Sequence, residues 1–304
     1  MNPSPIRDVS DTAFMVAQYR AMETERADAL FRDPLAARLA GDRGRRIVEG
    51  MEHGPLRHWA TASYNRTLVW TMAIRTRIID DFILEGVSRG TQALLNLGAG
   101  LDTRPYRMAL PESFHWIEVD YPHMIDFKQH TLAGERPRCM LERVALDLAD
   151  VPARSSLLAA VAARFDKVLV LTEGVIPYLS VEAAGTLADD LASHPSFRGW
   201  IVDYISPQAL QFRNRSATHR LMKNAPFLFQ PTDYFGFFAA HGWSRRHMRY
   251  IWDEGQRLKR RIPLPAAAKL WFALRSLVIS RARHVDMRKF MAYVLFEPSR
   301  GPAR

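Results

Sequence analysis

Cysteine is almost absent from this sequence, which holds a single one, Cys139, in 304 residues. One thiol excludes an internal disulfide framework and a thiolate metal cluster, and the histidines show no metal-ligand spacing, so we expect no bound metal. Uninterrupted apolar runs are also short, and none approaches the roughly 18 residues that a transmembrane helix needs. The polar start of the chain lacks the apolar stretch of a signal peptide. We therefore expect a cytoplasmic protein without a membrane span.

Lysine is scarce as well: it contributes only six of the 42 basic residues, so the formal net charge of +10 comes mainly from arginine. A basic surface can attract nucleic acid, anionic lipid or an acidic substrate. The arginines are scattered rather than gathered in one run, which argues against a nucleic-acid partner. With 48% hydrophobic and 24% charged residues, the chain has the composition of a soluble protein with an ample core.

The first 85 residues carry no strand signal, and we assign residues 1–85 to a helical N-terminal cap. Apolar residues recur at helical spacing from residue 60 to residue 84. Ser10 or Asp11 can cap an earlier helix. A short helix is expected to begin at Asp33-Pro34 and to end at Gly41, because glycine commonly follows the last helical residue.

Short apolar runs alternate with helical stretches after Gly86, which predicts an α/β fold with a mostly parallel sheet and helices on both faces. The predicted strands are residues 93–97, 116–120, 138–145, 167–172, 199–205, 243–252 and 290–296. The predicted helices are residues 104–109, 123–133, 157–164, 181–192, 232–241 and 265–283. We assign residues 86–304 to one domain with lid insertions near 206–232 and 253–286.

A glycine loop, Gly98-Ala99-Gly100, follows the first predicted strand. Glycine lets a ligand approach the backbone closely, and ligands of open parallel sheets bind beyond the carboxyl ends of the strands. A dinucleotide needs a third glycine, but Thr103 stands at that position. The remaining pattern, with Asp102, suits a nucleoside cofactor that carries an amino group and a sulfonium, as S-adenosylmethionine does. An ordinary strand-to-helix turn is the alternative interpretation.

Acidic residues follow the next two strands. Asp120 lies 22 positions after Gly98 (120 − 98 = 22), near the spacing at which an acid accepts hydrogen bonds from ribose hydroxyls. We include the adjacent Tyr121 in this cofactor site. Asp147 can accept a hydrogen bond from an adenine amino group while Leu148 packs on the ring. The alternatives are a solvated strand-end carboxylate at Asp120 and a helix cap at Asp147.

Several motifs together resemble the leucine carboxyl methyltransferase family, and within it the bacterial branch of S-adenosylmethionine-dependent methyltransferases that includes the tetracenomycin-type polyketide carboxyl O-methyltransferases. The resemblance covers roughly residues 10–205, and the C-terminal third is much less diagnostic. The motifs are TAFMVAQYRAMETERADALFRDPLA (12–36), IRTRIIDDF (74–82), NLGAGLDTRPYR (96–107), VDYPHMIDFK (119–128), ALDLAD (145–150) and TEGVIPYLS (172–180).

The resemblance implies a class I methyltransferase (Rossmann-like) fold and S-adenosylmethionine as methyl donor, with S-adenosylhomocysteine as the product. It implies cofactor contacts at Gly98, Asp120, Asp147, Leu148 and Glu173. In the family, an arginine from the helix before the first strand holds the cofactor carboxylate. We assign this role to Arg75, with Arg77 as second choice; a solvated helix face is the alternative for both.

Glu173 and Gly174 follow the strongly apolar fourth strand, which places them at the expected methyl-transfer point. We predict that Glu173 holds the methionine amino group or lines the acceptor pocket, and that Tyr178 borders the acceptor. Both are our candidate catalytic residues. A helix-initiating acid at Glu173 and a packing role for Tyr178 are the alternatives.

The resemblance also suggests a carboxylate as the methyl acceptor. A carboxylate is ionised near neutrality, so it can displace the sulfonium methyl group directly and needs no general base. Catalysis would then come from alignment and from the exclusion of water. An alcohol or phenol acceptor would need a base. His123, His219 and His241 are the candidates for it, although we expect each to be structural.

Residues 204–235 combine aromatic side chains with arginines, which suits a planar or apolar acid. We predict acceptor contacts by Tyr204, Arg213 and His219; a subsidiary core is the alternative. The leading hypothesis is a small-molecule carboxyl O-methyltransferase of secondary metabolism, acting as a monomer or homodimer. The alternatives are methylation of a protein or peptide C-terminal carboxylate, an RNA-modifying or nucleic-acid-binding relative, and a nicotinamide dehydrogenase, which Thr103 disfavours.

Overall fold

The computed structural model describes residues 9–52, 59–215, 224–263 and 287–299, and the chain forms two compact units. The first unit comprises Met1–Arg77, Ile205–Asn224 and Arg249–Ala292, and the second comprises Ile78–Tyr204, Ala225–Met248 and Tyr293–Arg304. The predicted helix 265–283 lies outside the described residues. Helix α3 (Trp59–Ser88) runs past residue 85 without a break, so the domain boundary predicted there stays a prediction.

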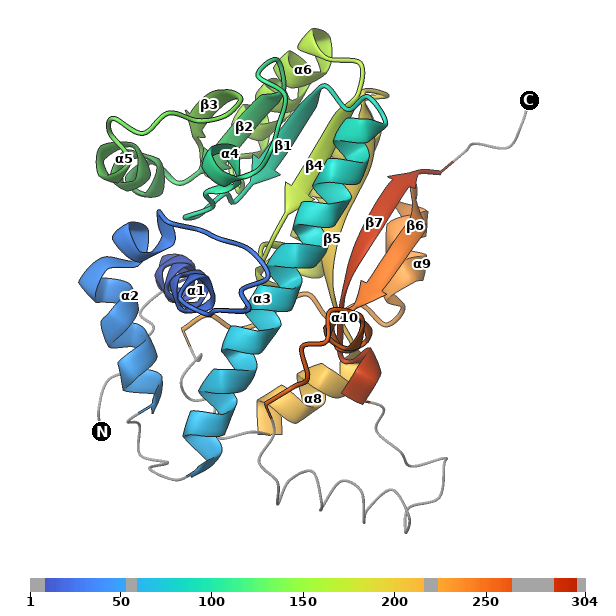
Figure 1. Cartoon of the computed structure of the whole chain (residues 1–304). Helices are drawn as coiled ribbons and strands as arrows, with labels where there is room; N and C mark the ends of the chain where they lie inside the picture. Colours follow the sequence, from blue (N-terminus) through green and yellow to red (C-terminus); the bar gives the residue numbers. More distant parts are fainter. Residues whose placement is uncertain (1–8, 53–58, 216–223, 264–286, 300–304) are drawn as a thin grey trace. The chain divides into compact units, whose positions relative to one another are not determined.

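The described part of the first unit is helical. It contains α1 (Val9–Thr24), α2 (Ala36–Glu52), most of α3, α8 (Pro207–Arg215), α10 (Ile251–Arg257) and the short η4 (Met287–Lys289) (Figure 1). Helix α1 packs against α2, and α10 packs against η4. Helix α8 has no counterpart among the predicted helices.

Of two predictions about the N-terminal helices, the break at Gly41 is confirmed and the cap at Ser10 or Asp11 is wrong. Helical backbone is interrupted at Gly41, which has φ 52° and ψ −158°, and a second helical segment follows directly and runs to Glu52, so α2 consists of two helices joined at a kink. Glycine tolerates this conformation, so the chain bends there and then resumes helical geometry. Ser10 and Asp11 lie inside α1, which already begins at Val9. The Asp11 carboxylate pairs with Arg43 of α2 at 2.6 Å instead of capping its own helix.

An ion pair with the buried Glu23 carboxylate connects the segment after α10 to helix α1. Nη2 of Arg260 donates to both carboxylate oxygens of Glu23, at 2.7 and 2.5 Å. The carbonyl of Arg260 accepts a hydrogen bond from Trp70 Nε1 at 2.7 Å. The segment after α10 therefore joins α1 to α3, although these residues are far apart in the sequence.

We expect Arg260→Met to lower the free energy of unfolding by about 2 kcal/mol, because it removes the closest cation from the buried Glu23 carboxylate. Urea unfolding followed by circular dichroism measures this change. Arg261→Met, at the exposed neighbouring position, is the control and should change the free energy of unfolding by less than about 0.5 kcal/mol. Equal stability of the two variants would contradict the role of Arg260.

The second unit is built on a sheet. In the described residues, seven strands form this sheet in the order β3-β2-β1-β4-β5-β7-β6 (Figure 1). The strands are β1 (Ala93–Leu97), β2 (His115–Asp120), β3 (Met140–Ala145), β4 (Val168–Thr172), β5 (Phe197–Ile205), β6 (Trp243–Tyr250) and β7 (Met291–Pro298). The first five strands pair in parallel, with β1 between β2 and β4. The predicted mostly parallel sheet is confirmed.

Helices connect the strands of this sheet. They are α4 (Arg104–Arg107), α5 (Pro122–Thr131), α6 (Val151–Arg164), the short η1 (Ile176–Tyr178), α7 (Val181–Ala192) and α9 (Tyr234–Ala240). The predicted bounds of α7 are confirmed. Strand β6 ends two residues earlier than predicted, because α10 begins at Ile251.

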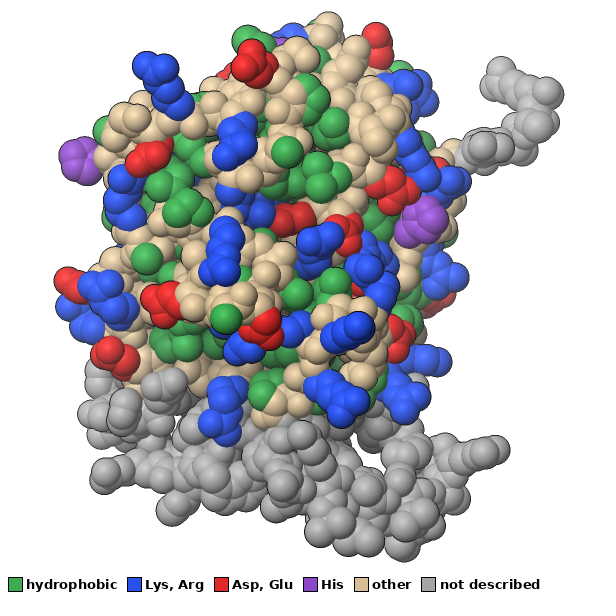
Figure 2. Space-filling model, viewed as in Figure 1, with side chains coloured by type: hydrophobic (Ala, Val, Ile, Leu, Met, Phe, Trp, Pro, Cys, Tyr) green, Lys and Arg blue, Asp and Glu red, His purple; other side chains and the backbone are tan. Residues whose placement is uncertain are grey.

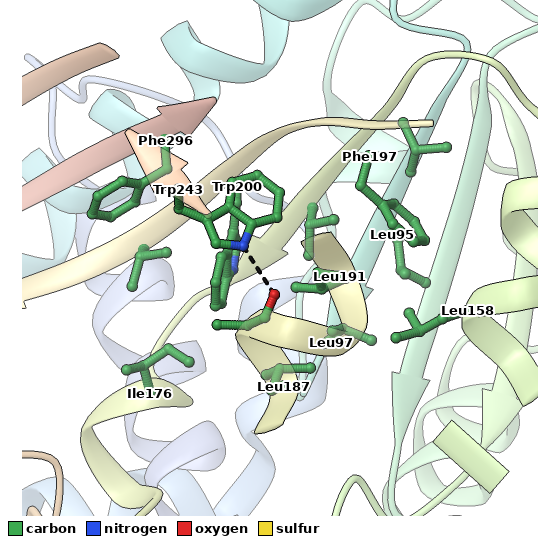
Figure 3. Close-up of a cluster of buried hydrophobic side chains, with 14 of the residues drawn as sticks. Leu95, Leu97, Leu158, Ile176, Leu187, Leu191, Phe197, Trp200, Trp243 and Phe296 are labelled. Carbon is green, nitrogen blue, oxygen red and sulfur yellow. Dashed lines mark hydrogen bonds between the residues drawn. The ribbon is translucent and has the colours of Figure 1, made fainter. Parts of the chain in front are cut away.

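The core of the second unit explains why β1 and β4 are mostly apolar. Every residue of β1 and β4 is buried, as expected for central parallel strands that are covered on both faces. Beside them, Trp200 packs edge to face on Trp243 and on Phe238, with ring centroids 5.3 Å apart in each pair. Trp243 donates from Nε1 to the Ala188 carbonyl at 3.0 Å, the hydrogen bond drawn in Figure 3. This hydrogen bond satisfies the polar group of a fully buried ring.

Cys139 is buried immediately before β3. Burial, together with the negative charge of Glu118, raises the pKa of its thiol to about 12. Because the thiolate is the reactive form, Cys139 should resist iodoacetamide at about pH 8 in the folded chain and react once urea unfolds the chain. Mass spectrometry counts the adducts. Rapid alkylation of the folded chain would contradict this burial.

Charged groups of both signs are interspersed on the face of the molecule shown in Figure 2. Basic side chains are not gathered into one patch on that face, in keeping with their scatter along the sequence. In the described part of the chain, no helix combines the length and the apolar character that crossing a bilayer requires.

Candidate functional site

The glycine loop lies where the carboxyl ends of β1, β2 and β4 meet. Gly98 (φ 71°) and Gly100 (φ 47°) adopt left-handed backbone that other residues rarely tolerate. The amides of Gly98 and Ala99 donate to the Val119 carbonyl, at 2.8 and 3.0 Å, which ties the loop to β2. A Cβ atom at Gly98 would lie 2.4 Å from Cγ2 of Val175, so the loop after β4 leaves no room for a side chain there.

Asp120 braces this loop from the end of β2. One of its carboxylate oxygens accepts from the Gly100 amide at 2.6 Å, and the other accepts from the Tyr121 amide at 2.8 Å. Burial raises the pKa of the Asp120 carboxyl, although these amides and the charges of Lys128 and His123 oppose the rise. Each carboxylate oxygen has a second lone-pair site, so Asp120 has the acceptor capacity for the two hydroxyls of a diol such as ribose.

A buried guanidinium, that of Arg104 in α4, joins the loops after β1 and β4. Its Nη1 donates to Asp102 at 2.7 Å and to Glu173 at 2.6 Å, and its Nε donates to Asp80 of α3 at 2.7 Å. Burial would lower the pKa of Arg104, but Asp102, Glu173 and Asp80 raise it well above its usual value. The three carboxylates therefore share a permanent cation.

Two of these carboxylates have further partners. Arg107 donates to both oxygens of Asp80, at 2.7 and 2.9 Å. Burial would raise the pKa of Asp80, yet Arg107 and Arg104 lower it below its usual value. Asp102 accepts from Asn96 Nδ2 at 3.0 Å and from the Arg104 amide at 2.9 Å. Asp102 therefore stabilises the glycine loop, and its contact with a cofactor stays a prediction.

Asp203 of β5 fixes the backbone just after β4. The amide of Gly174 (φ 69°) donates to one Asp203 carboxylate oxygen at 2.8 Å, and the Tyr293 hydroxyl donates to the other at 2.6 Å. We did not predict a role for Asp203, Arg104 or Asp80. A partner for Asp203 could have been predicted from the sequence, because an acid inside the mostly apolar strand FRGWIVDYI needs partners when it is buried. Arg104 and Asp80 lie within the family motifs 96–107 and 74–82, but their neighbours in the sequence do not indicate their partners.

Tyr121 lies near two of the predicted acidic residues. Burial raises the pKa of its hydroxyl, and the negative charges of Asp147 and Asp120 raise it further. The Tyr121 ring is exposed and stacks on His123, with ring centroids 5.7 Å apart. The structure thus brings an aromatic surface and two carboxylates close to the end of β2.

The loop after β3 carries Asp147 and Leu148. One oxygen of Asp147 accepts from the Ala149 amide at 2.9 Å, whereas the residue that caps α6 is Asp150. The alternative interpretation of Asp147 as the helix cap is therefore wrong. Contacts of Asp147 and Leu148 with an adenine stay predictions.

Tyr178 ends η1, next to the segment that precedes α9. Its ring meets Phe227 edge-on, with centroids 5.2 Å apart. The carbonyl of Pro177 accepts from the amides of Leu228 and Phe229, at 2.8 and 3.2 Å. These backbone hydrogen bonds fix residues 228 and 229 beside the loop that carries Glu173 and Tyr178.

The predicted acceptor residues are distributed over both units. Tyr204 packs edge to face on Tyr234 at 4.9 Å between centroids, within an aromatic cluster of the second unit. Arg213 lies on α8 and Arg75 on α3, both in the first unit, and His219 lies outside the described residues. Contacts of these residues with cofactor or acceptor stay predictions.

Known proteins resemble this chain over most of its length. Residues 13–192 match the family model described as leucine carboxyl methyltransferase. A relative from Mycobacteroides abscessus, named "Putative S-adenosyl-L-methionine-dependent methyltransferase", is 33% identical over 220 residues, which span 70% of this chain and 69% of the relative. A relative from Streptomyces coelicolor with the same description is 34% identical over 247 residues, which span 76% of this chain and 82% of the relative.

A solved structure shares the fold. A DUF574 family protein from Streptomyces avermitilis aligns with a TM-score of 0.52 over 94% of this chain and 97% of its own, at 15% identity. The strand order and this likeness confirm the predicted Rossmann-like methyltransferase fold. Because the family model matches more than half of the residues, the chain belongs to the leucine carboxyl methyltransferase family, a family of S-adenosylmethionine-dependent methyltransferases.

Proposed function

We propose that the chain methylates the carboxylate of a small organic acid and forms a methyl ester and S-adenosylhomocysteine. The observation that carries this proposal is the ion pair of Glu173 with Arg104 at the end of β4. A carboxylate that is held 2.6 Å from a permanent cation is a poor general base. An acceptor that arrives already ionised needs no base.

The residues around the glycine loop fit the cofactor. When bound, S-adenosylmethionine supplies an electrophilic methyl group on its sulfonium. Asp120 would accept hydrogen bonds from the ribose hydroxyls, and the small residues from Gly98 to Gly100 would allow the cofactor close to the backbone. Glu173 would hold the cationic amino group. This set of one diol acceptor and one amine acceptor matches the chemistry of the cofactor better than that of a dinucleotide.

Two of the three histidines that we considered as bases have other contacts in the described structure. His241 pairs through Nδ1 with Asp189 of α7 at 2.7 Å, and His123 stacks on Tyr121. We propose that both rings have structural roles, as we expected from the sequence. These contacts favour direct in-line transfer to a carboxylate over base-assisted transfer to an alcohol or phenol.

The aromatic rings beside the loop after β4 support an apolar or aromatic acid. Tyr178 and Phe227 contact each other there, and Tyr204 stacks on Phe235 with centroids 5.7 Å apart. Such rings can pack on a planar acceptor while its carboxylate reaches the methyl group. A peptide with a free C-terminal carboxylate is the second class of acceptor to test.

The proposal is tested with a panel of aromatic and aliphatic acids, each paired with the alcohol or phenol of the same skeleton. We expect S-adenosylhomocysteine to form with acids only, and the product to release methanol in mild alkali, because methyl esters hydrolyse and methyl ethers do not. An alkali-stable product from a phenol would contradict carboxylate methylation. Turnover with peptides but not with free acids would contradict the small-molecule proposal.

Two matched variants test the role of Glu173 in the same assay. Glu173→Gln should lower kcat/KM about tenfold or more, because it removes a charge-assisted hydrogen bond to the cofactor amino group. Glu182→Gln, at the exposed start of α7, should leave kcat/KM unchanged. Equal activity of the two variants would show that Glu173 does not contact the reacting groups.

A further inference from the structure

Lys128 of α5 has a completely buried side chain. Its ammonium donates to Glu118 Oε1 at 2.7 Å, and the Glu118 side chain is buried completely as well. Burying an ammonium is costly even when it is paired, and an apolar side chain of similar length avoids that cost. The position therefore calls for an explanation beyond packing.

Glu118 already has a second cation. Nε of Arg143, its register partner on β3, donates to Glu118 Oε2 at 3.0 Å, and Nη2 of Arg143 donates to the Tyr106 hydroxyl at 2.5 Å. Arg143 alone can neutralise the Glu118 carboxylate. The group of Lys128, Glu118 and Arg143 thus carries one positive charge in excess.

The excess charge lies beside Asp120. Residues 118 and 120 are two apart on β2, so their side chains project to the same face of the sheet. Helix α5 packs on β2 and β3 and brings Lys128 and His123 toward this carboxylate. The loop after β3 brings Asp147 near Tyr121, and the glycine loop contributes the Gly100 amide.

We propose that Lys128 is a positioning residue whose buried ammonium keeps the Asp120 carboxylate ionised and ready for the ribose hydroxyls of the cofactor. This inference rests on the proposed cofactor site. In the VDYPHMIDFK motif (119–128), Asp120 would bind the cofactor and Lys128 would support Asp120. Burial raises the pKa of Asp120, and the charge of Lys128 opposes that rise.

The direction of the pH effect follows from this arrangement. Only the ionised carboxylate can accept from both ribose hydroxyls, so cofactor affinity should fall as the pH drops through the pKa of Asp120. Removing a neighbouring positive charge raises that pKa and moves the loss of affinity to higher pH. Removing a neighbouring negative charge moves it to lower pH.

Two variants break the same buried ion pair from opposite sides. Lys128→Met removes the positive charge, and Glu118→Gln removes the negative charge while Lys128 and Arg143 remain. Calorimetry with S-adenosylhomocysteine from about pH 8 down to about pH 4.5 measures the midpoint of the affinity loss. We expect an upward shift of about one pH unit for Lys128→Met, so binding at the wild-type midpoint falls about fivefold. For Glu118→Gln we expect a downward shift.

If Lys128 has a purely structural role, both variants are less stable, and their midpoints of affinity loss either stay unchanged or move in the same direction. Either result would overturn the proposal. Lys128→Arg should restore the wild-type midpoint if it folds. If Lys128→Met does not fold, an unchanged midpoint in Glu118→Gln still overturns the proposal, because the charges around Glu118 would then not reach Asp120. A wild-type chain that binds no S-adenosylhomocysteine at any pH would refute the cofactor site itself, which is a different outcome.

Discussion

Asp120→Ala is expected to weaken the binding of S-adenosylmethionine about a hundredfold, because the variant loses two hydrogen bonds from ribose hydroxyls to a charged acceptor. Each such hydrogen bond contributes about 1.5 kcal/mol or more in a partly buried site. The variant also loses the acceptor for the Gly100 amide, so the glycine loop itself is less well held. Calorimetry at about pH 8, where the Asp120 carboxylate is ionised, measures the affinity.

Asp126→Ala supplies the matched control for Asp120→Ala. Asp126 is an exposed carboxylate on α5, six residues further along the chain (126 − 120 = 6), and its removal should leave the affinity unchanged. Near-ultraviolet circular dichroism checks that the tertiary structure survives in both variants. Full cofactor affinity in a folded Asp120→Ala variant would refute the assignment of Asp120 to the ribose.

Gly98→Ala is expected to destabilise the chain by about 3 kcal/mol and to abolish measurable cofactor binding. A left-handed backbone conformation costs an alanine about 1–2 kcal/mol. Overlap of the new methyl group with Val175, whose Cγ2 would be 2.4 Å away, adds about 1–3 kcal/mol. Urea unfolding measures the stability, and calorimetry with S-adenosylmethionine measures the binding.

Two further variants separate these two costs. Gly134→Ala places alanine at another left-handed position (φ 87°) with no atom within 4 Å, so it should show the backbone cost alone. Combining Gly98→Ala with Val175→Ala removes the methyl group that is overlapped and should recover about 1–2 kcal/mol of the loss. If Gly98→Ala is no worse than Gly134→Ala, the loops after β1 and β4 are not in contact at Gly98.

The fold could be predicted well wherever burial and chain geometry leave one solution. The runs 93–97 and 167–172 are mostly apolar, and both became central strands of the parallel sheet. Ser180 predicted the start of α7, because its side chain caps the helix by accepting from the Ala183 amide. Gly41 interrupts helical backbone as predicted, but the second helical segment of α2, which follows it directly and runs to Glu52, was not predicted.

The residues of the candidate site also fall into those that could be predicted from the sequence and those that could not. Gly98, Gly100 and Asp120 could be recognised from the sequence, because backbone freedom and the spacing of an acid after a glycine loop are local properties. Two of the three carboxylate partners of Arg104 could not be recognised: they lie 24 residues before it, at Asp80, and 69 residues after it, at Glu173. Any of the 32 acidic residues could pair with an arginine, and only tertiary packing selects among them.

The sequence by itself therefore determined the class of fold, the family and the position of the glycine loop with its acidic residue. These features depend on apolar periodicity and on short motifs, which are properties of neighbouring residues. Only the tertiary structure decided that Asp203 holds the Gly174 amide and that Lys128 and Arg143 share the Glu118 carboxylate. A buried charge takes its partner from whichever strand or helix packs against it, so this choice is made only when the chain folds.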